Sequence, residues 1–239
     1  MFQNYLNYFK LFISEIYHFV RPNFNRSKII KKLNQDGIVA ISEFFNKAEC
    51  AQLIEKFNNL EPSVFVKLDN DKRLFFAENQ IKEIKSIFDK KELNFIKKKY
   101  IGAFNVSSWM INNTFFKKNS LGSGGDWHRD SALRRQLKFI VYLNDVTENN
   151  GPFQYILGSH KLSSKLYFSS KSNFDIGKTR FNVSEIANND KCQKITGKKG
   201  TLIIVDTSGL HRGTPIVIGE RYAITEYIFD FNLDKGYGK

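Results

Sequence analysis

The tetrapeptide "WHRD", residues 127–130, places a histidine and an aspartate two positions apart. Successive side chains of a β-strand point to opposite faces, so His128 and Asp130 would share one face and Arg129 would occupy the other. An imidazole nitrogen and a carboxylate oxygen on one face can bind the same transition-metal ion. The letters His-Arg-Asp also occur in the catalytic loop of protein kinases, where the aspartate accepts a proton from a hydroxyl group. The two interpretations require different partners elsewhere in the chain.

The kinase interpretation fails because its partners are missing. A kinase catalytic loop requires an asparagine five residues after the aspartate, and this chain has Arg135 there. No Asp-Phe-Gly motif follows. The glycine-rich run "GSGG", residues 122–125, lies directly before the tripeptide, whereas the glycine-rich loop of a kinase lies far upstream. We therefore exclude a protein kinase.

A metal site needs a third ligand, and the other histidines of the chain limit the choice. His18 lies in an N-terminal helical stretch and His160 in the turn "LGSHK", whereas His211 follows the apolar run "GTLIIVD" and precedes the last strand. In a two-sheet fold that late segment can lie opposite the strand of His128, so we select His211. Two histidines and one carboxylate form the facial triad of non-haem iron(II) oxygenases, which leaves three positions open. A zinc hydrolase could use the same ligands, but no nearby glutamate offers an obvious general base.

The open positions suggest a chelating cosubstrate. In oxygenases that use 2-oxoglutarate, the keto-acid end of the cosubstrate binds iron and O₂ takes the last position. The distal carboxylate then needs a cation, and the planar fork of arginine makes two hydrogen bonds to it. Arg221 opens the strand-like run "RYAITEYIF", shortly after His211. The residues thus predict Fe(II), 2-oxoglutarate and O₂ as cofactor and cosubstrates.

The elements that must position these residues are mostly strands. Helical patterns occupy the N-terminal third, with Asn46 as the cap of one helix and Gly37 as the end of another. From about residue 104, runs of β-branched and aromatic residues alternate with glycine-rich turns, at residues 104–116, 136–146, 153–157, 200–206 and 221–231. We predict one domain over 1–239, mostly β with flanking helices and a double-stranded β-helix (jelly-roll or cupin-like) core. Residues 158–197, which have weak periodicity, are predicted to be a lid or substrate insertion.

The net charge, the cysteines and the N-terminal segment limit the partners, the redox compartment and the location that we expect for the protein. Thirty-seven basic and 24 acidic residues give a net charge of +13, which fits acidic partners or simply the Lys- and Asn-rich composition. Cys50 and Cys192 have no CxxC spacing, which favours free thiols in a reducing compartment. Residues 1–22 have the spacing of an amphipathic helix and lack the features of a signal peptide. We expect this helix to pack on the domain or a second subunit, or to contact a membrane surface, with the protein cytoplasmic or peripheral on the inner face.

Several longer segments resemble one enzyme family, the phytanoyl-CoA dioxygenase-like Fe(II)/2-oxoglutarate oxygenases. The segments are "WHRD", "LNDVTENNGPFQYILGSHK", "HRGTPIVIGERYAITEYIF" and "LNQDGIVAISEFFNKAECAQLIEKF". The similarity extends from about residue 30 and is weakest across 161–195. One departure is Leu157, which replaces the proline usual before Gly-Ser-His and affects only a turn.

The resemblance implies a role for each matching position. His128, Asp130 and His211 would bind iron, Arg221 would bind the distal carboxylate of 2-oxoglutarate, and Met110 would line the cosubstrate pocket. No catalytic side chain beyond the iron ligands is implied. Halogenating relatives replace the carboxylate ligand with a small residue, so the presence of Asp130 implies hydroxylation.

The substrate is less constrained than the reaction. Basic residues lie among aromatic ones in the long connection, at Lys161, Lys165, Lys171, Lys178 and Arg180. We predict hydroxylation of a C–H bond in an anionic small molecule, or in a glycan or lipid-linked sugar, with release of succinate and CO₂. The alternative is a catalytically inactive jelly roll that binds a glycan or acts as a scaffold. A nucleic-acid demethylase is disfavoured, because such enzymes place paired arginines on the last strand. The sequence leaves the oligomeric state open.

Overall fold

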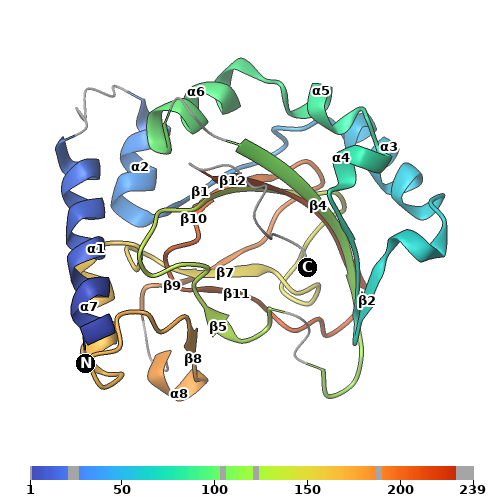
Figure 1. The fold of residues 1–239 in the computed structure, drawn as a ribbon. Helices are drawn as coiled ribbons and strands as arrows, with labels where there is room; N and C mark the ends of the chain where they lie inside the picture. The colour runs from blue at the N-terminus through green and yellow to red at the C-terminus, as the bar shows by residue number, and fades with distance from the viewer. Residues whose placement is uncertain (1, 21–26, 103–105, 121–123, 187–189, 230–239) are drawn as a thin grey trace.

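Two antiparallel β-sheets face each other and carry helices on their outer sides (Figure 1). The structure is a computed structural model, and it describes residues 2–20, 27–102, 106–120, 124–186 and 190–229. The larger sheet has the order β1 (Ile38–Ile41), β10 (Leu202–Asp206), β6 (Leu137–Tyr142), β12 (Glu220–Phe229), β4 (Val106–Phe115), β3 (Asp71–Phe75), β2 (Val66–Leu68). The smaller sheet has the order β8 (Arg180–Phe181), β5 (Trp127–His128), β11 (His211–Gly213), β7 (Phe153–Ile156), β9 (Cys192–Ile195). The predicted jelly-roll class is confirmed.

The alternation of side chains along the strands produces separate apolar layers. In β10, Leu202 and Ile204 pack with the helices, whereas Ile203 and Val205 point to the space between the sheets. The inner layer also takes Tyr155 from the smaller sheet. Because the period of a strand is two, each buried strand of the larger sheet contributes to two layers, which accounts for its nearly continuous apolar sequence.

Helices from the N-terminal third cover the outer face of the larger sheet. They are α2 (Lys28–Asp36), α3 (Lys47–Asn58), the 3₁₀ turn η1 (Pro62–Val64), α4 (Ala77–Gln80), α5 (Ile84–Phe88) and α6 (Lys91–Tyr100). Asn46 caps α3 in a reciprocal box with Glu49, and Gly37 ends α2 at φ 83°, as the sequence predicts. A β-carbon at Gly37 would lie 2.2 Å from the Tyr155 hydroxyl, so this end of α2 requires glycine.

The segment 158–197 folds against the smaller sheet. It contains α7 (Leu162–Ser170), β8, α8 (Val183–Ile186) and β9, and its part in substrate binding stays a prediction. Phe168 of α7, Phe181 of β8 and Ile186 of α8 form an apolar cluster on the outer face of this sheet. Trp127, Ile156 and Leu210 complete this cluster, so the segment shares its apolar core with the rest of the domain.

The N-terminal helix α1 (Phe2–Val20) lies along α7 (Figure 1). The Tyr8 hydroxyl is 2.6 Å from that of Ser169, and the Glu15 carboxylate is 3.2 Å from the Lys165 ammonium. The opposite face of α1 exposes large apolar side chains to solvent, namely those of Tyr5, Phe9, Phe12, Ile13 and Ile16. None of the helices in the described ranges is long and apolar enough to cross a membrane. Residues 21–22 of the predicted helix lie outside the described residues.

Candidate metal centre

The pairing of two short strands brings the distant histidines together. His211 opens β11 and lies directly opposite His128 of β5. The two strands are short, and β11 is also held on its other edge by β7. The prediction that one strand carries both His128 and Asp130 is wrong, because β5 ends at His128 and Asp130 lies in a bend. The Asp130 amide donates a 2.9 Å hydrogen bond to the Thr207 carbonyl, so the bend still aims the carboxylate at the histidines.

The three side chains form one candidate ligand set. One ligand atom from each of His128, Asp130 and His211 lies within 4.8 Å of the others. His211 Nε2 is 3.9 Å from Asp130 Oδ1, and the two imidazole centroids are 4.3 Å apart. These separations suit donors arranged around a single ion of roughly 2 Å bond length.

Backbone carbonyls fix the tautomers of both histidines. His128 Nδ1 is 2.8 Å from the Asp126 carbonyl, and His211 Nδ1 is 3.0 Å from the Gly209 carbonyl. A carbonyl oxygen only accepts hydrogen bonds, so each Nδ1 carries the proton and each Nε2 keeps its lone pair. Each Nε2 atom can therefore bind a metal ion through its lone pair.

The surroundings keep both imidazoles neutral. Burial lowers the pKa of His211 to about 3, although the Asp130 carboxylate acts in the opposite direction. Burial also lowers the pKa of His128, which is less enclosed. A neutral imidazole is the metal-binding form, so protons compete with a metal at this site less than at an ordinary histidine.

Lys138 completes the set, and the sequence analysis did not find it. Its ammonium is 2.6 Å from Asp130 Oδ2, and it also lies 4.4 Å from the centroid of the Tyr227 ring. Burial raises the pKa of Asp130, but interactions led by the charge of Lys138, with hydrogen bonds from Lys138 and Thr207, outweigh burial and hold it well below its usual value. The available signal was a lysine in the run "QLKFIVYL", on the same inward face of the strand as Ile140 and Tyr142.

Arg221 and Met110 line the same space as the histidines. A cavity of about 120 Å³ between the sheets is bordered by His128, His211, Lys138, Arg221 and Met110, among others. Arg221 is half-buried and donates from Nη1 to the Gly151 carbonyl. A β-carbon at Gly213 would lie 3.5 Å from Arg221 Nη2, so that glycine leaves room beside the guanidinium.

Arg73 of β3 borders the same cavity and was also missed by the sequence analysis. Its Nε is 2.6 Å from Asp71, whose carboxylate accepts from the Asn112 amide and the Thr114 hydroxyl. The hairpin β2–β3 that carries Arg73 and Asp71 was not predicted. Its strands are short, and β2 is exposed throughout, so the apolar pattern of a buried strand is weak there.

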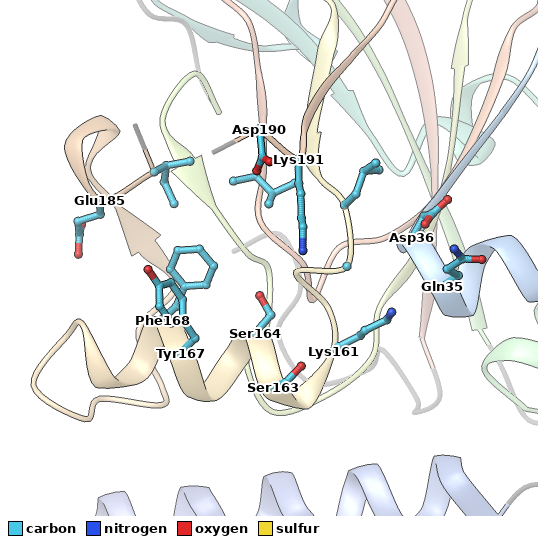
Figure 2. Close-up of a pocket in the computed structure, with 14 residues that line it drawn as sticks. Gln35, Asp36, Lys161, Ser163, Ser164, Tyr167, Phe168, Glu185, Asp190 and Lys191 are labelled. Atoms are coloured by element: carbon cyan, nitrogen blue, oxygen red, sulfur yellow. The ribbon is translucent and has the colours of Figure 1, made fainter. Parts of the chain in front are cut away.

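The remaining features lie away from the triad. His160 is buried, and its Nε2 is 3.1 Å from the Asn34 carbonyl. A larger groove of about 800 Å³ runs between the end of α2, α7 and α8 (Figure 2). Lys161 and Lys191 extend into it from opposite sides, and Asp36, Glu185 and Asp190 also line it. None of the residues that border this groove belongs to the triad.

The family of the chain follows from its sequence. The model of the phytanoyl-CoA dioxygenase (PhyH) family matches residues 33–217. The chain belongs to this family. The resemblance noted in the motifs is thereby confirmed, and this PhyH protein is a 2-oxoglutarate-dependent non-haem iron enzyme. No curated protein sequence matches it significantly.

Solved structures share the fold at low sequence identity. HygX from Streptomyces hygroscopicus, with nickel and 2-oxoglutarate bound, is 11% identical with a TM-score of 0.66, over 90% of this chain and 93% of its own. EctD from S. alaskensis with bound Fe is 17% identical with a TM-score of 0.63, over 87% and 78%. The epimerase SnoN, in complex with Fe³⁺, alpha-ketoglutarate and nogalamycin RO, is 11% identical with a TM-score of 0.62, over 88% and 91%. The PhyH protein therefore has the jelly-roll fold of these structures along most of its length.

Proposed function

We propose that this PhyH protein hydroxylates a C–H bond of an anionic small molecule or glycan, using Fe(II), 2-oxoglutarate and O₂. The observation that carries the proposal is the convergence of His128, Asp130 and His211 beside a cavity that both histidines and Arg221 line. The donor set fits iron(II), because two neutral imidazoles and one ionised carboxylate make a facial triad with three positions to spare. Bound iron with 2-oxoglutarate and O₂ supplies the oxidant, and the cosubstrate leaves as succinate and CO₂.

The protein contributes the position of the ligands and the charge around them. The hydrogen bonds to the Asp126 and Gly209 carbonyls hold the two imidazoles in the ligating tautomer. Lys138 engages one oxygen of Asp130 and leaves Oδ1 facing His211, which favours a single-oxygen bond to the metal. Such partners of ligands orient them and tune the site.

Arg221 is the proposed partner of the distal carboxylate of 2-oxoglutarate. Its guanidinium lies in a narrow cavity with apolar walls from Met110, Ile140 and Phe153. A charge-assisted pair is stronger there than in water because the local dielectric is low. Met110 would contact the cosubstrate through its apolar side chain, as the sequence analysis predicts.

Positive charge near the triad supports an anionic substrate. Arg180 of β8 lies directly opposite His128 in the sheet, so the two side chains leave the sheet on the same face. Arg73 and Lys138 border the cavity as well, and the whole chain carries a charge of +13. Of the basic residues named in the sequence analysis, Arg180 is therefore the one best placed to meet a substrate. Lys165 is buried against Glu15, and Lys178 is paired with Glu185.

The deciding experiment measures 2-oxoglutarate binding and its turnover together. Calorimetry under nitrogen should show Fe(II)-dependent binding of 2-oxoglutarate, and admission of air should release succinate. Asp130→Ala should lose both signals, and Arg221→Met should weaken binding of the cosubstrate while the metal still binds. Arg212→Met is the matched control, since Arg212 pairs with Gln154 and stacks on Trp127. Wild-type protein that binds no 2-oxoglutarate with iron present would leave the inactive jelly roll as the better description.

For the location, we propose a cytoplasmic protein that touches an anionic membrane surface through α1. The support is the exposed apolar stripe from Tyr5 to Ile16 together with the excess positive charge. Flotation with phosphatidylserine vesicles should carry the wild type. A variant with Phe9 and Phe12 changed to serine should float less, whereas the same change at exposed Phe115 should not matter. Equal flotation of the wild type and the Phe9 and Phe12 variant would exclude this contact.

A further inference from the structure

Arg129 is buried on the side of the smaller sheet that carries Trp127 and Phe181, which is the side opposite to His128. It follows His128 directly, and its side chain is 2% exposed. The guanidinium carbon lies 5.0 Å from the centroid of the Phe181 ring, which covers one face of the group. The backbone is held in place by a 2.9 Å hydrogen bond from the Arg129 amide to the Thr179 carbonyl.

The polar edge of this guanidinium has no partner within the described chain. Nε and Nη2 are both buried without a hydrogen-bond acceptor. These two atoms form the side of the fork that pairs with both oxygens of a carboxylate or phosphate. A buried arginine without a counter-ion is costly, because burial of an unpaired charge far exceeds the loss of an ordinary hydrogen bond.

The neighbouring charges do not supply the missing anion. Lys165 of α7 is 1% exposed, close enough to Arg129 for repulsion to contribute to its lowered pKa, of which burial is the main cause. The carboxylate of Glu15 lies 3.2 Å from Lys165, and Asp206 accepts from the Tyr100 hydroxyl at 2.6 Å and from the Ser208 amide at 2.9 Å.

We propose that Arg129 binds a small oxyanion, a carboxylate or phosphate group, in a second site behind β5, with Lys165 supplying additional positive charge. The site is separate from the cavity that His128 and His211 line, because Arg129 does not border that cavity and its guanidinium packs on Phe181, on the other face of the smaller sheet. Phe181 and the fork select a planar or tetrahedral oxyanion over chloride, since chloride cannot engage Nε and Nη2 through two atoms. Binding would fix the segment that carries two metal ligands.

The test is anion-dependent thermal stability of the full-length protein without 2-oxoglutarate, at constant ionic strength. Formate and inorganic phosphate are the probes, and chloride is the reference. A ligand at 100 times its Kd should raise the melting temperature by roughly 5 °C or more in a protein of this size. The increment should saturate, and the more effective of formate and phosphate identifies the class of oxyanion.

Substitutions test whether Arg129 is the residue that causes the anion-dependent rise in melting temperature. Arg129→Met should lose the increment and be at least as stable as the wild type in chloride, because the change removes an unpaired buried charge. Arg129→Lys should also lose most of the increment in melting temperature, since lysine keeps the positive charge but lacks the two adjacent donors of the guanidinium. Arg134→Met, an exposed neighbour, and Arg221→Met, in the other cavity, should both retain it. An unchanged increment in Arg129→Lys, or a wild type with no saturable response to either probe, would overturn the proposal.

Discussion

His211 and His128 lie directly opposite each other in paired strands, and each imidazole bonds to the carbonyl two residues before it in the chain. The same local arrangement thus occurs twice, at Asp126–His128 and at Gly209–His211. The hydrogen bond at each Nδ1 comes from the backbone just before β5 or β11, so this backbone helps to set the direction of both Nε2 atoms, and Phe153 also stacks on the His211 ring. Substitutions that move this backbone should therefore lower the metal affinity as strongly as substitutions of the ligands themselves.

Gly209→Ala tests the backbone at His211. An added β-carbon would lie 2.0 Å from the Tyr155 hydroxyl and 2.7 Å from Ser159 Oγ. Displacement of these groups should cost about 1–3 kcal/mol of unfolding free energy, as for overpacked cores, and should move the carbonyl that holds His211. Urea denaturation and Fe(II) titration measure the two effects. Gly177→Ala is the control, because its nearest neighbour would be 3.3 Å away. Unchanged metal affinity in Gly209→Ala would contradict the argument.

Lys138→Met tests the partner of Asp130. Without the ammonium, burial dominates and the pKa of Asp130 should rise, so protons should compete with the metal as the pH falls. Loss of such a partner typically weakens metal binding by about 10- to 100-fold. We expect the loss of Fe(II) affinity to be larger at pH 6 than at pH 8, measured by competition with a chromogenic chelator. A uniform loss at both pH values would indicate that Lys138 only positions the carboxylate.

The sequence is sufficient to predict the strands that are buried and long. The prediction of β6, β10 and β12 rests on their runs of β-branched and aromatic residues, and these strands do form the centre of the larger sheet. Arg221 opens β12, so its place in a long strand could be predicted from the sequence. The capping box at Asn46 and the glycine at 37 were also readable, since each is a local signal.

Short elements and contacts between distant residues could not be predicted from the sequence. β5 and β11 have too few residues for a period to be visible, and they form because each pairs with neighbours on both sides. The lysine at 138 and the arginine at 73 reach the site by packing between sheets, and no local pattern records such a contact. Arg129 was expected to point away from the metal, but its burial without a partner depends on α7 and Phe181.

Arg221→Met and Arg221→Lys separate charge from shape in the proposed cosubstrate pocket. A buried charge-assisted pair contributes several kcal/mol when one partner is removed, so Arg221→Met should weaken 2-oxoglutarate binding by about 100-fold or more. Arg221→Lys should recover part of the affinity, because it keeps the charge but loses the bidentate geometry. Calorimetry with Fe(II) present measures both, and Fe(II) affinity itself should stay within about twofold. Equal binding by wild type and Arg221→Met would place the cosubstrate elsewhere.

The pKa of His211 predicts how the metal-free protein responds to acid. Its folded-state pKa is about 3, against an ordinary value of 6.5, so between these values the unfolded chain binds a proton that the folded chain does not. The stabilising contribution is thus complete above pH 6.5 and is lost as the pH falls towards 3. From pH 7 to pH 5 the free energy of unfolding should drop by about 2 kcal/mol through this residue alone. Urea denaturation with a chelator present should show the drop, and His211→Asn should lack that part of it. His160, which lies away from the triad and whose pKa is also lowered, remains in both proteins and cancels in the difference. An identical pH dependence in wild type and His211→Asn would mean that the His211 imidazole is not shielded from protons as its burial implies.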